Sequence, residues 1–339
     1  MPEPTPHSPK RRGRFLRAGS AFTVLLAVSG YVTVQYLTGS RLGPGCEVFS
    51  DGGAVRYAFS PEQAVNAATI AAVGTERGMP ERAVTIALAT AIQESGLRNI
   101  EHGDRDSLGL FQQRPSQGWG TERQILDPTY AAAEFYAHLA KVDDYAELPL
   151  TVAAQRVQRS GYPEAYAKHE PDATLLAAAL TGNAAATLSC TGRPDPTETP
   201  SATDAQTPAQ DAVRAALARD FGRDVLQPVG AQVSGGAQTS AEPTPSATAT
   251  AAPDSGERTL RLAVSAKSSP AKGSSDRQRG WQLAQWAVAN AAALHIDEVT
   301  YAGREWAAGN VDPRWRTVRG AEADGASKAT DAVRIVLAQ

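Results

Sequence analysis

Apolar residues in the first half of the chain recur at the spacing of an α-helix. Between Pro80 and Gly96 they fall on one helical face, which predicts a helix with a buried stripe made of Val84, Ala87, Leu88, Ala91 and Ile92. Gly96 supplies a stop signal. An earlier helix is predicted from Ser60 to Arg77, because a serine cap is followed by proline and, three residues on, by glutamine.

Three later stretches continue the helical pattern. Asp127-Pro128 repeats the cap-plus-proline signal, residues 151–158 have a helical pattern, and a last helical stretch from Pro163 reaches about Leu188. No run between residues 46 and 190 alternates convincingly as a strand would. We therefore expect residues 46–190 to form a mainly helical domain of ordinary size.

The composition changes at residue 191. Residues 191–257 are rich in Pro, Thr, Ser and Ala, with a candidate helix at 211–226 that could dock on the region after it. Segments with so few large apolar groups cannot offset the entropy of ordering, so we expect disordered linkers here. Residues 258–339 combine alternating and helical patterns and predict a small α+β domain of unassigned role.

Four of the five tryptophans lie in this last region. Stacking on sugar rings is one use for them, and filling a small core is the other. We favour the core.

The N-terminus combines a basic tail with a long uncharged run. Lysine and arginine crowd residues 1–17, and no charged residue occurs in 18–40, which is long enough to cross a bilayer because a spanning helix needs ~20 residues. This pattern predicts a single-pass signal anchor in the cell membrane, with the N-terminus in the cytoplasm and the bulk of the chain outside. A cleaved signal peptide is the alternative.

Charge and cysteine content narrow the class of protein. The net charge of −3 over 339 residues gives no footprint for nucleic acid. Cys46 and Cys190 flank the helical region, and an even count in an exported chain predicts a disulfide, with two free thiols as the alternative. Their spacing fits neither a zinc site nor a redox motif, and we predict no metal and no cofactor.

Three carboxylates mark a candidate site for chemistry. Glu94 lies on the last turn of the 80–96 helix, and Asp104 and Asp106 follow in a polar loop. An apolar stripe and a helix C-terminus both disfavour a charged carboxylate, so Glu94 could be the proton donor that glycosidic bond cleavage needs. Taken alone, Glu94 fits an ordinary surface glutamate equally well, and Asp104 and Asp106 are more typical of a solvated loop. His102 with Asp104 is too small a set to predict a metal site.

The same stretch resembles a known group of enzymes. Glu94-Ser95, followed by Gly109-Leu110-Phe111-Gln112, is similar to the Glu-Ser and Gly-Leu-Met-Gln motifs of goose-type lysozymes and soluble lytic transglycosylases, which have a lysozyme-like fold. The resemblance covers roughly residues 60–185 and is concentrated in 92–114.

The resemblance implies cleavage of the β-1,4 bond between N-acetylmuramic acid and N-acetylglucosamine, with Glu94 as general acid. Asp104, and by the same argument Asp106, would position the attacking water in an inverting hydrolysis. Without such a base, the muramic 6-hydroxyl would attack and leave an anhydro sugar. Substrate contacts are expected from Ser95, Gly109, Leu110, Phe111, Gln112 and Gln113.

Two departures from the family pattern keep a second function open. The third motif of the family, Ala-Tyr-Asn, has its nearest match at Ser160-Gly161-Tyr162, and we expect Tyr162 to reach Glu94. Gln113-Arg114 lacks the acidic residue of goose-type enzymes. The chain is therefore either a peptidoglycan glycosidase or a lysozyme-like protein that binds or scaffolds the cell wall without turnover.

Overall fold

The computed structural model describes residues 45–160, 163–191, 209–226, 258–265, 274–310, 314–318 and 332–338. The helices of the first part begin where the cap signals predicted. Ser60 accepts from the backbone N–H of Gln63 and Gln63 accepts from that of Ser60, so α2 (Pro61–Glu76) opens with a capping box. The helix α3 (Glu81–Ser95) ends at Gly96, whose φ of 63° closes it in the left-handed region.

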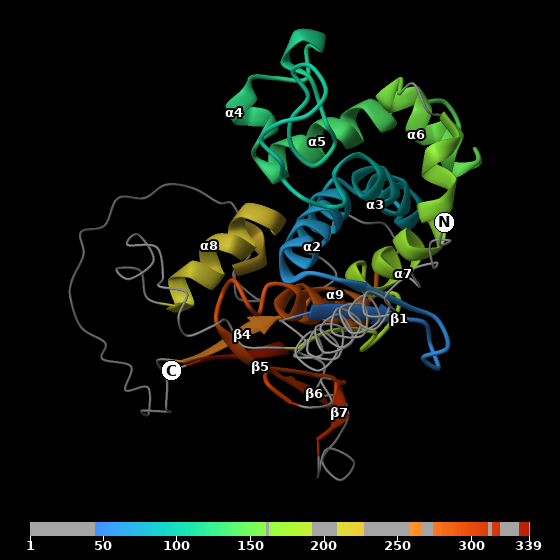
Figure 1. The fold of residues 1–339 in the computed structure, drawn as a ribbon. Coiled ribbons are helices and arrows are strands. Elements are labelled where there is room, and N and C mark those ends of the chain that lie inside the picture. Colours follow the sequence, from blue (N-terminus) through green and yellow to red (C-terminus); the bar gives the residue numbers. More distant parts are fainter. Residues whose placement is uncertain are drawn as a thin grey trace, which may run out of the picture. The chain divides into compact units, whose positions relative to one another are not determined.

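Of the remaining helices of this part, α5 (Pro128–Leu139), α6 (Leu150–Gln158) and α7 (Glu170–Leu180) pack around α3 (Figure 1). Asp127 caps α5 as predicted, accepting from the N–H groups of Thr129 and Tyr130. The other elements are α4 (Glu122–Ile125) and two 3₁₀ helices at Pro115–Gln117 and Pro163–His169. Both α7 and the second 3₁₀ helix pack on α3, which places the side chains of the 163–169 segment beside the end of α3.

The predicted fold class is wrong. Residues 46–190 were expected to hold no strand, yet β1 (Gly45–Phe49), β2 (Arg56–Phe59) and β3 (Leu188–Thr191) form an antiparallel sheet in the order β2-β1-β3. The predicted last helix stops at Leu180, and its expected end at Leu188 begins a strand. These strands are too short for an alternating pattern to stand out, and β1 pairs with β3 across almost the whole region.

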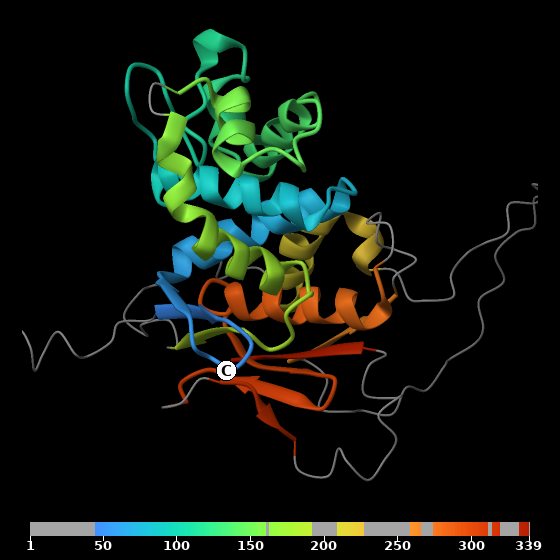
Figure 2. The same ribbon diagram turned by 90° about the vertical axis from the view of Figure 1, so that its right-hand side faces the viewer.

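The described elements after residue 258 form a second antiparallel sheet. Its order is β4-β8-β5-β6-β7, with β4 at Thr259–Ala263, β8 at Ala332–Leu337, β5 at Ile296–Tyr301, β6 at Arg304–Ala307 and β7 at Arg316–Thr317. The helix α9 (Asp276–Ala289) contacts β5 and β8 on one side and α2 and α7 on the other (Figure 2). The four tryptophans of this region are at most 6% exposed, which confirms the prediction that they fill a core.

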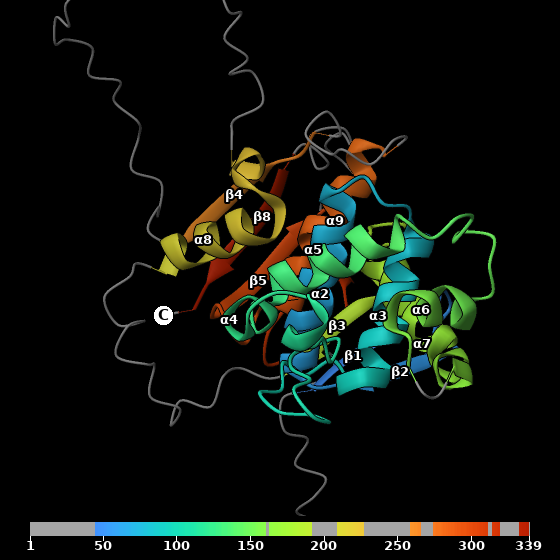
Figure 3. The same cartoon turned by 90° about the horizontal axis from the view of Figure 1, so that it is seen from above.

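Buried polar side chains join the two parts of the chain. Arg279 of α9 is 2% exposed and forms an ion pair of 2.7 Å with Glu76 of α2. Asp220, on α8 (Ala209–Phe221), accepts from Thr69 of α2 at 3.2 Å and from the Trp286 indole of α9 at 2.8 Å. Figure 3 shows α8 beside α2. Because a buried charge needs its partners, these contacts fix α9 and α8 on the first helices, and the described residues from 45 onward belong to one compact unit.

Several predictions fall outside the described residues. Among the residues that are described, no helix has both the length and the apolar character needed to cross a bilayer. The predicted span at 18–40 and the basic tail at 1–17 lie outside them, as do most of the predicted linkers. The candidate helix at 211–226 is present as α8 followed by a 3₁₀ turn, Arg223–Leu226.

Candidate functional site

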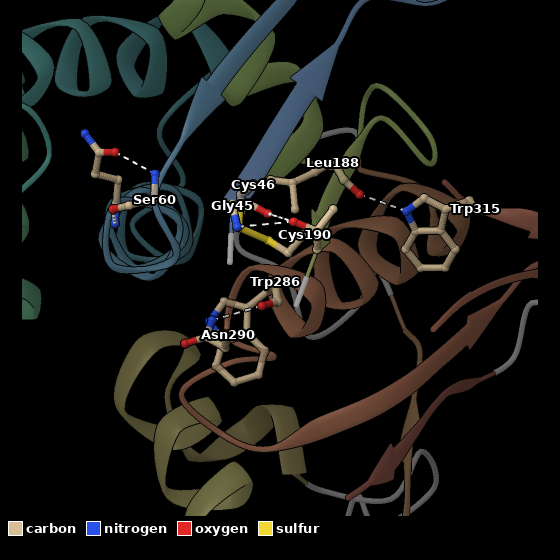
Figure 4. The surroundings of a disulfide bond; sticks show 10 residues. Gly45, Cys46, Ser60, Leu188, Cys190, Trp286, Asn290 and Trp315 are labelled. Atoms are coloured by element: carbon tan, nitrogen blue, oxygen red, sulfur yellow. Dashed lines mark hydrogen bonds between the residues drawn. A yellow bond between two sulfur atoms is a disulfide. The ribbon is translucent and has the colours of Figure 1, made fainter. Parts of the chain in front are cut away.

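The disulfide predicted from the cysteine count is present. Cys46 and Cys190 are directly paired residues of β1 and β3, and their sulfur atoms are bonded (Figure 4). In the same view, the Trp315 indole donates to the Leu188 carbonyl at 2.9 Å, so β3 is also held from the second sheet. The bridge thus joins the two ends of the region that contains Glu94.

The candidate acid lies at the point where α3 stops. Its helix is almost wholly buried from Ala83 to Ala91, and Glu94 follows one turn later, partly buried. The Tyr166 hydroxyl donates to Glu94 Oε1 at 2.6 Å. Tyr166 comes from the 163–169 helix and its side chain is fully buried. The acid is therefore held in one orientation by a rigid neighbour.

Burial sets the protonation of Glu94. Removal from water raises the pKa of its carboxyl, and the hydrogen bonds from Tyr166 and Gln158 oppose that rise without cancelling it. Burial and the nearby carboxylate also raise the pKa of the Tyr166 phenol, which stays a donor. A carboxyl whose pKa is raised by its surroundings carries its proton closer to neutral pH, as a general acid requires.

The Gly109–Gln112 loop is fastened to the end of α3. Ser95 Oγ donates to the Leu110 carbonyl at 2.8 Å, and Gln158 Nε2 donates to the Phe111 carbonyl at 2.7 Å. Because the Gln158 amide also bonds Glu94, it links the acid to the loop. At Gly109, φ is +73° and a Cβ would lie 2.7 Å from the Ile125 carbonyl oxygen, so only glycine fits.

Four of the predicted substrate contacts are used inside the protein, and Ser95, which bonds the Leu110 carbonyl, is one of them. Leu110 and Phe111 are fully buried, and the Phe111 ring stacks on Phe135 at 4.7 Å between centroids. Gln113 is 2% exposed and donates to the Ala131 carbonyl at 3.1 Å. Gln112, with φ at 48°, remains half-buried beside Gly103. The Gln112 side chain keeps partial exposure, while the carbonyls of Gly109, Leu110 and Phe111 already accept hydrogen bonds within the protein.

The two loop carboxylates differ from Glu94 and from each other. Asp106 Oδ1 accepts from Arg114 Nε at 2.6 Å and Oδ2 accepts from the Ser116 N–H at 2.9 Å. Hydrogen bonds from Ser116 and Arg114 hold the pKa of Asp106 far below its usual range. Asp104 is 94% exposed, with Arg105 at 3.9 Å. Asp106 closes the loop onto Arg114, and Asp104 extends into solvent.

Among the described residues, the tyrosine that bonds Glu94 is one that the sequence did not single out. Tyr162 lies outside the described residues, and Tyr166 makes the hydrogen bond. The signal was present in Ala165-Tyr166, which supplies the first two residues of the Ala-Tyr-Asn motif with Ala167 in the third place. Gln158 carried no motif and could not have been found. Within the described part of the chain, no three metal-ligating side chains come together.

The comparison with known proteins found a similarity in the C-terminal part of the chain. A family model described as VldE, C-terminal domain, matches residues 238–329, which is less than a third of the sequence and does not include Glu94. No curated protein matches the chain. The resemblance of residues 92–114 to lysozyme-like enzymes is not tested by either result and stays a prediction.

Proposed function

We propose that the chain is a peptidoglycan glycosidase that works outside the cytoplasm and cleaves the β-1,4 bond between N-acetylmuramic acid and N-acetylglucosamine. The observation that carries this proposal is Glu94, a carboxyl with a burial-raised pKa, held at 2.6 Å by Tyr166 and linked through Gln158 to the 109–112 loop. The disulfide supports a location outside the reducing cytoplasm.

Glu94 acts first as the proton donor. Tyr166 bonds Oε1 of the carboxyl, so the acidic proton is carried on Oε2 and passes to the glycosidic oxygen as the C–O bond breaks. Because Asp106 has both oxygens engaged by Arg114 and Ser116, it is a poor base for water. That leaves two routes to the product: a water held by Asp104, or attack by the muramic 6-hydroxyl with Glu94 taking the proton back.

The test is the release of soluble fragments from purified peptidoglycan by the full chain. Glu94→Gln keeps the shape and hydrogen bonding of the side chain but removes the proton, so we expect release to fall by a factor on the order of 100 to 10,000. Glu101→Gln, an exposed carboxylate of the following loop, is the matched control and should release fragments at the wild-type rate. Equal release by wild type and Glu94→Gln would overturn the role of Glu94.

Mass analysis of the products separates the two routes. A product one water lighter than the hydrolysed sugar indicates the anhydro route, and a reducing muramic end indicates hydrolysis. The Asp104→Asn variant should slow release only if water is the nucleophile.

The second candidate function is wall binding without turnover. Ala167 favours it, because it stands where the family pattern has asparagine. In that case the wild-type chain would sediment with insoluble peptidoglycan and release nothing, and Glu94→Gln would sediment equally well.

A further inference from the structure

A cavity whose lining does not include Glu94 lies between the two sheets. It has a volume of about 280 Å³ and is lined by the β1–β2 turn, the segment before β3, the first turns of α9, the β5–β6 turn and residues 314–315. We call it the basic pocket. Ligand pockets in proteins begin at roughly 300 Å³, so a ligand about the size of one sugar ring would fill it.

Positive charge dominates the lining of the basic pocket. Arg277, Arg304 and Arg314 line it together with a single carboxylate, Asp51. Arg277 and Arg304 are exposed, and neither is in an ion pair within the described residues. Guanidinium groups form paired hydrogen bonds with carboxylate and phosphate oxygens, and several of them around one cavity attract an anion.

Contacts behind the pocket hold its walls in place. Arg314 lies over the Phe49 ring at 5.6 Å from its centroid, which ties the 314–315 segment to β1. Trp315 donates to the Leu188 carbonyl at 2.9 Å. In the same segment, the Thr187 N–H donates to Gln285 Oε1 of α9 at 3.0 Å. Walls fixed in this way lose little entropy when a ligand enters.

The apolar part of the lining suits a compact ligand. Trp281 and Trp315 line the pocket and pack edge to face, with ring centroids 5.2 Å apart. Both indoles are at most 6% exposed, so only their edges are available to a ligand. Phe49 and the alanines at 185, 186 and 302 supply the rest of the apolar lining. Small side chains and aromatic edges leave room for a ring and offer no groove for a long hydrocarbon chain.

We propose that the basic pocket binds a small oxyanion, a carboxylate or phosphate group carried on a unit no larger than one sugar, with Arg277 and Arg304 as its main ligands. The pocket draws on the first sheet, α9 and the second sheet, so it exists only where the two parts of the chain pack together. It shares no residue with the Glu94 site, and binding there does not require that Glu94 be catalytic.

The experiment is titration of the full chain with three probes, followed by calorimetry and by tryptophan fluorescence, since Trp281 and Trp315 line the pocket. Inorganic phosphate tests the phosphate source and N-acetylmuramic acid the carboxylate source. N-acetylglucosamine is the neutral control because it lacks the lactyl carboxylate. We expect saturable binding of at least one anion, weakened by added salt, and no binding of the neutral sugar.

Variants then assign the pocket. Arg277→Ala and Arg304→Ala should each weaken binding by about tenfold or more, and Arg277→Lys should restore part of it because the charge returns without the paired geometry. Arg123→Ala, an exposed arginine on α4, should bind like wild type. Glu94→Gln should also bind like wild type. The binding result can therefore be interpreted whether or not the glycosidase proposal holds.

Three outcomes would overturn the proposal. These are binding of neither anion, equal binding of the neutral sugar, or unchanged affinity in the Arg277 and Arg304 variants. Both arginines are exposed, so their replacement should leave the fold intact, and circular dichroism of each variant checks this.

Discussion

Two carboxylates twelve residues apart on one stretch of chain have opposite environments. At the end of α3, burial raises the pKa of Glu94 while Tyr166 holds it at 2.6 Å. In the next loop, Arg114 and Ser116 bond Asp106 at 2.6 and 2.9 Å and lower its pKa. Side chains of nearly the same chemistry therefore take up different tasks, because one is removed from water and the other is given donors.

The largest expected effect is on fragment release, which should fall far more when Glu94 is replaced than when Asp106 is replaced. Glu94→Gln should reduce fragment release by at least about 100-fold, since an amide cannot deliver the proton that the proposed acid supplies. Asp106→Asn should reduce it by less than about threefold, because its hydrogen bonds stabilise the loop and the amide oxygen can keep one of them. Initial rates on the same peptidoglycan preparation measure both.

A loss of fragment release in Asp106→Asn as large as that in Glu94→Gln, at an unchanged melting temperature, would contradict this contrast between the two carboxylates. Asp106 would then belong to the catalytic set.

The next prediction concerns the stability of the Gly109–Gln112 loop. Gly109→Ala meets both a left-handed φ of +73° and the Ile125 carbonyl, so we expect a loss of about 1–3 kcal/mol in the free energy of unfolding. Gly118→Ala is the matched control, because its φ is +83° but nothing lies within 4 Å of the added Cβ. Denaturant unfolding of both variants separates the contact from the strained dihedral, and equal losses would show that Ile125 moves aside.

A smaller change concerns the partner of the acid. Tyr166→Phe removes the donor that favours the charged form of Glu94, so the pKa of Glu94 should rise further. In the proposed mechanism, activity needs protonated Glu94 and is lost as the pH rises through its pKa, so the alkaline limb of the profile should move to higher pH. We expect a rate about tenfold lower from the loss of orientation. A reduced rate with an unmoved pH profile would make Tyr166 a packing residue only.

The smallest effect is a pH-dependent difference in melting temperature between each variant and the wild type. The folded pKa of Asp106 lies below its unfolded value, so its stabilisation is present above the unfolded pKa and is lost as the pH falls. The folded pKa of Glu94 lies above its unfolded value, so its contribution is present at low pH and is lost as the pH rises. Asp106→Asn should therefore melt lower than wild type near neutral pH, and Glu94→Gln slightly higher.

Thermal melts from about pH 3 to about pH 8 follow both differences, which should shrink toward the acid end. A constant offset for either variant would show that charge does not cause it.

The sequence predicted local features better than long-range ones. The boundaries of α2, α3 and α5 follow from residues beside them, such as Ser60, Gly96 and Asp127. The β1–β3 pairing could not be predicted, because Val48 and Leu188 meet across the whole region and each strand is too short to show a period. The packing of α9 on α2 depends on Arg279 and Glu76, which look like surface residues in the sequence.

In the candidate site too, some features could be predicted from the sequence and others could not. Glu94 and the Gly109–Gln112 loop were named from the sequence because they form compact motifs. The roles of Leu110 and Phe111 were misjudged, since a motif shows which residues are present and not which way they point. Tyr166 was not predicted because the Ala-Tyr-Asn motif was matched to the segment ending at Tyr162 and not to Ala165-Tyr166.

The Cys46–Cys190 bond makes the intervening chain a closed covalent ring. A protease that cuts this region once, for instance at the exposed Gln117-Gly118 turn, opens the ring without dividing the molecule. The cut ends stay tethered through the sulfur atoms, and the remaining contacts can hold Glu94 beside Tyr166. In the proposed location outside the cytoplasm, where secreted proteases act, such a ring would tolerate one cut where an open chain would lose a fragment.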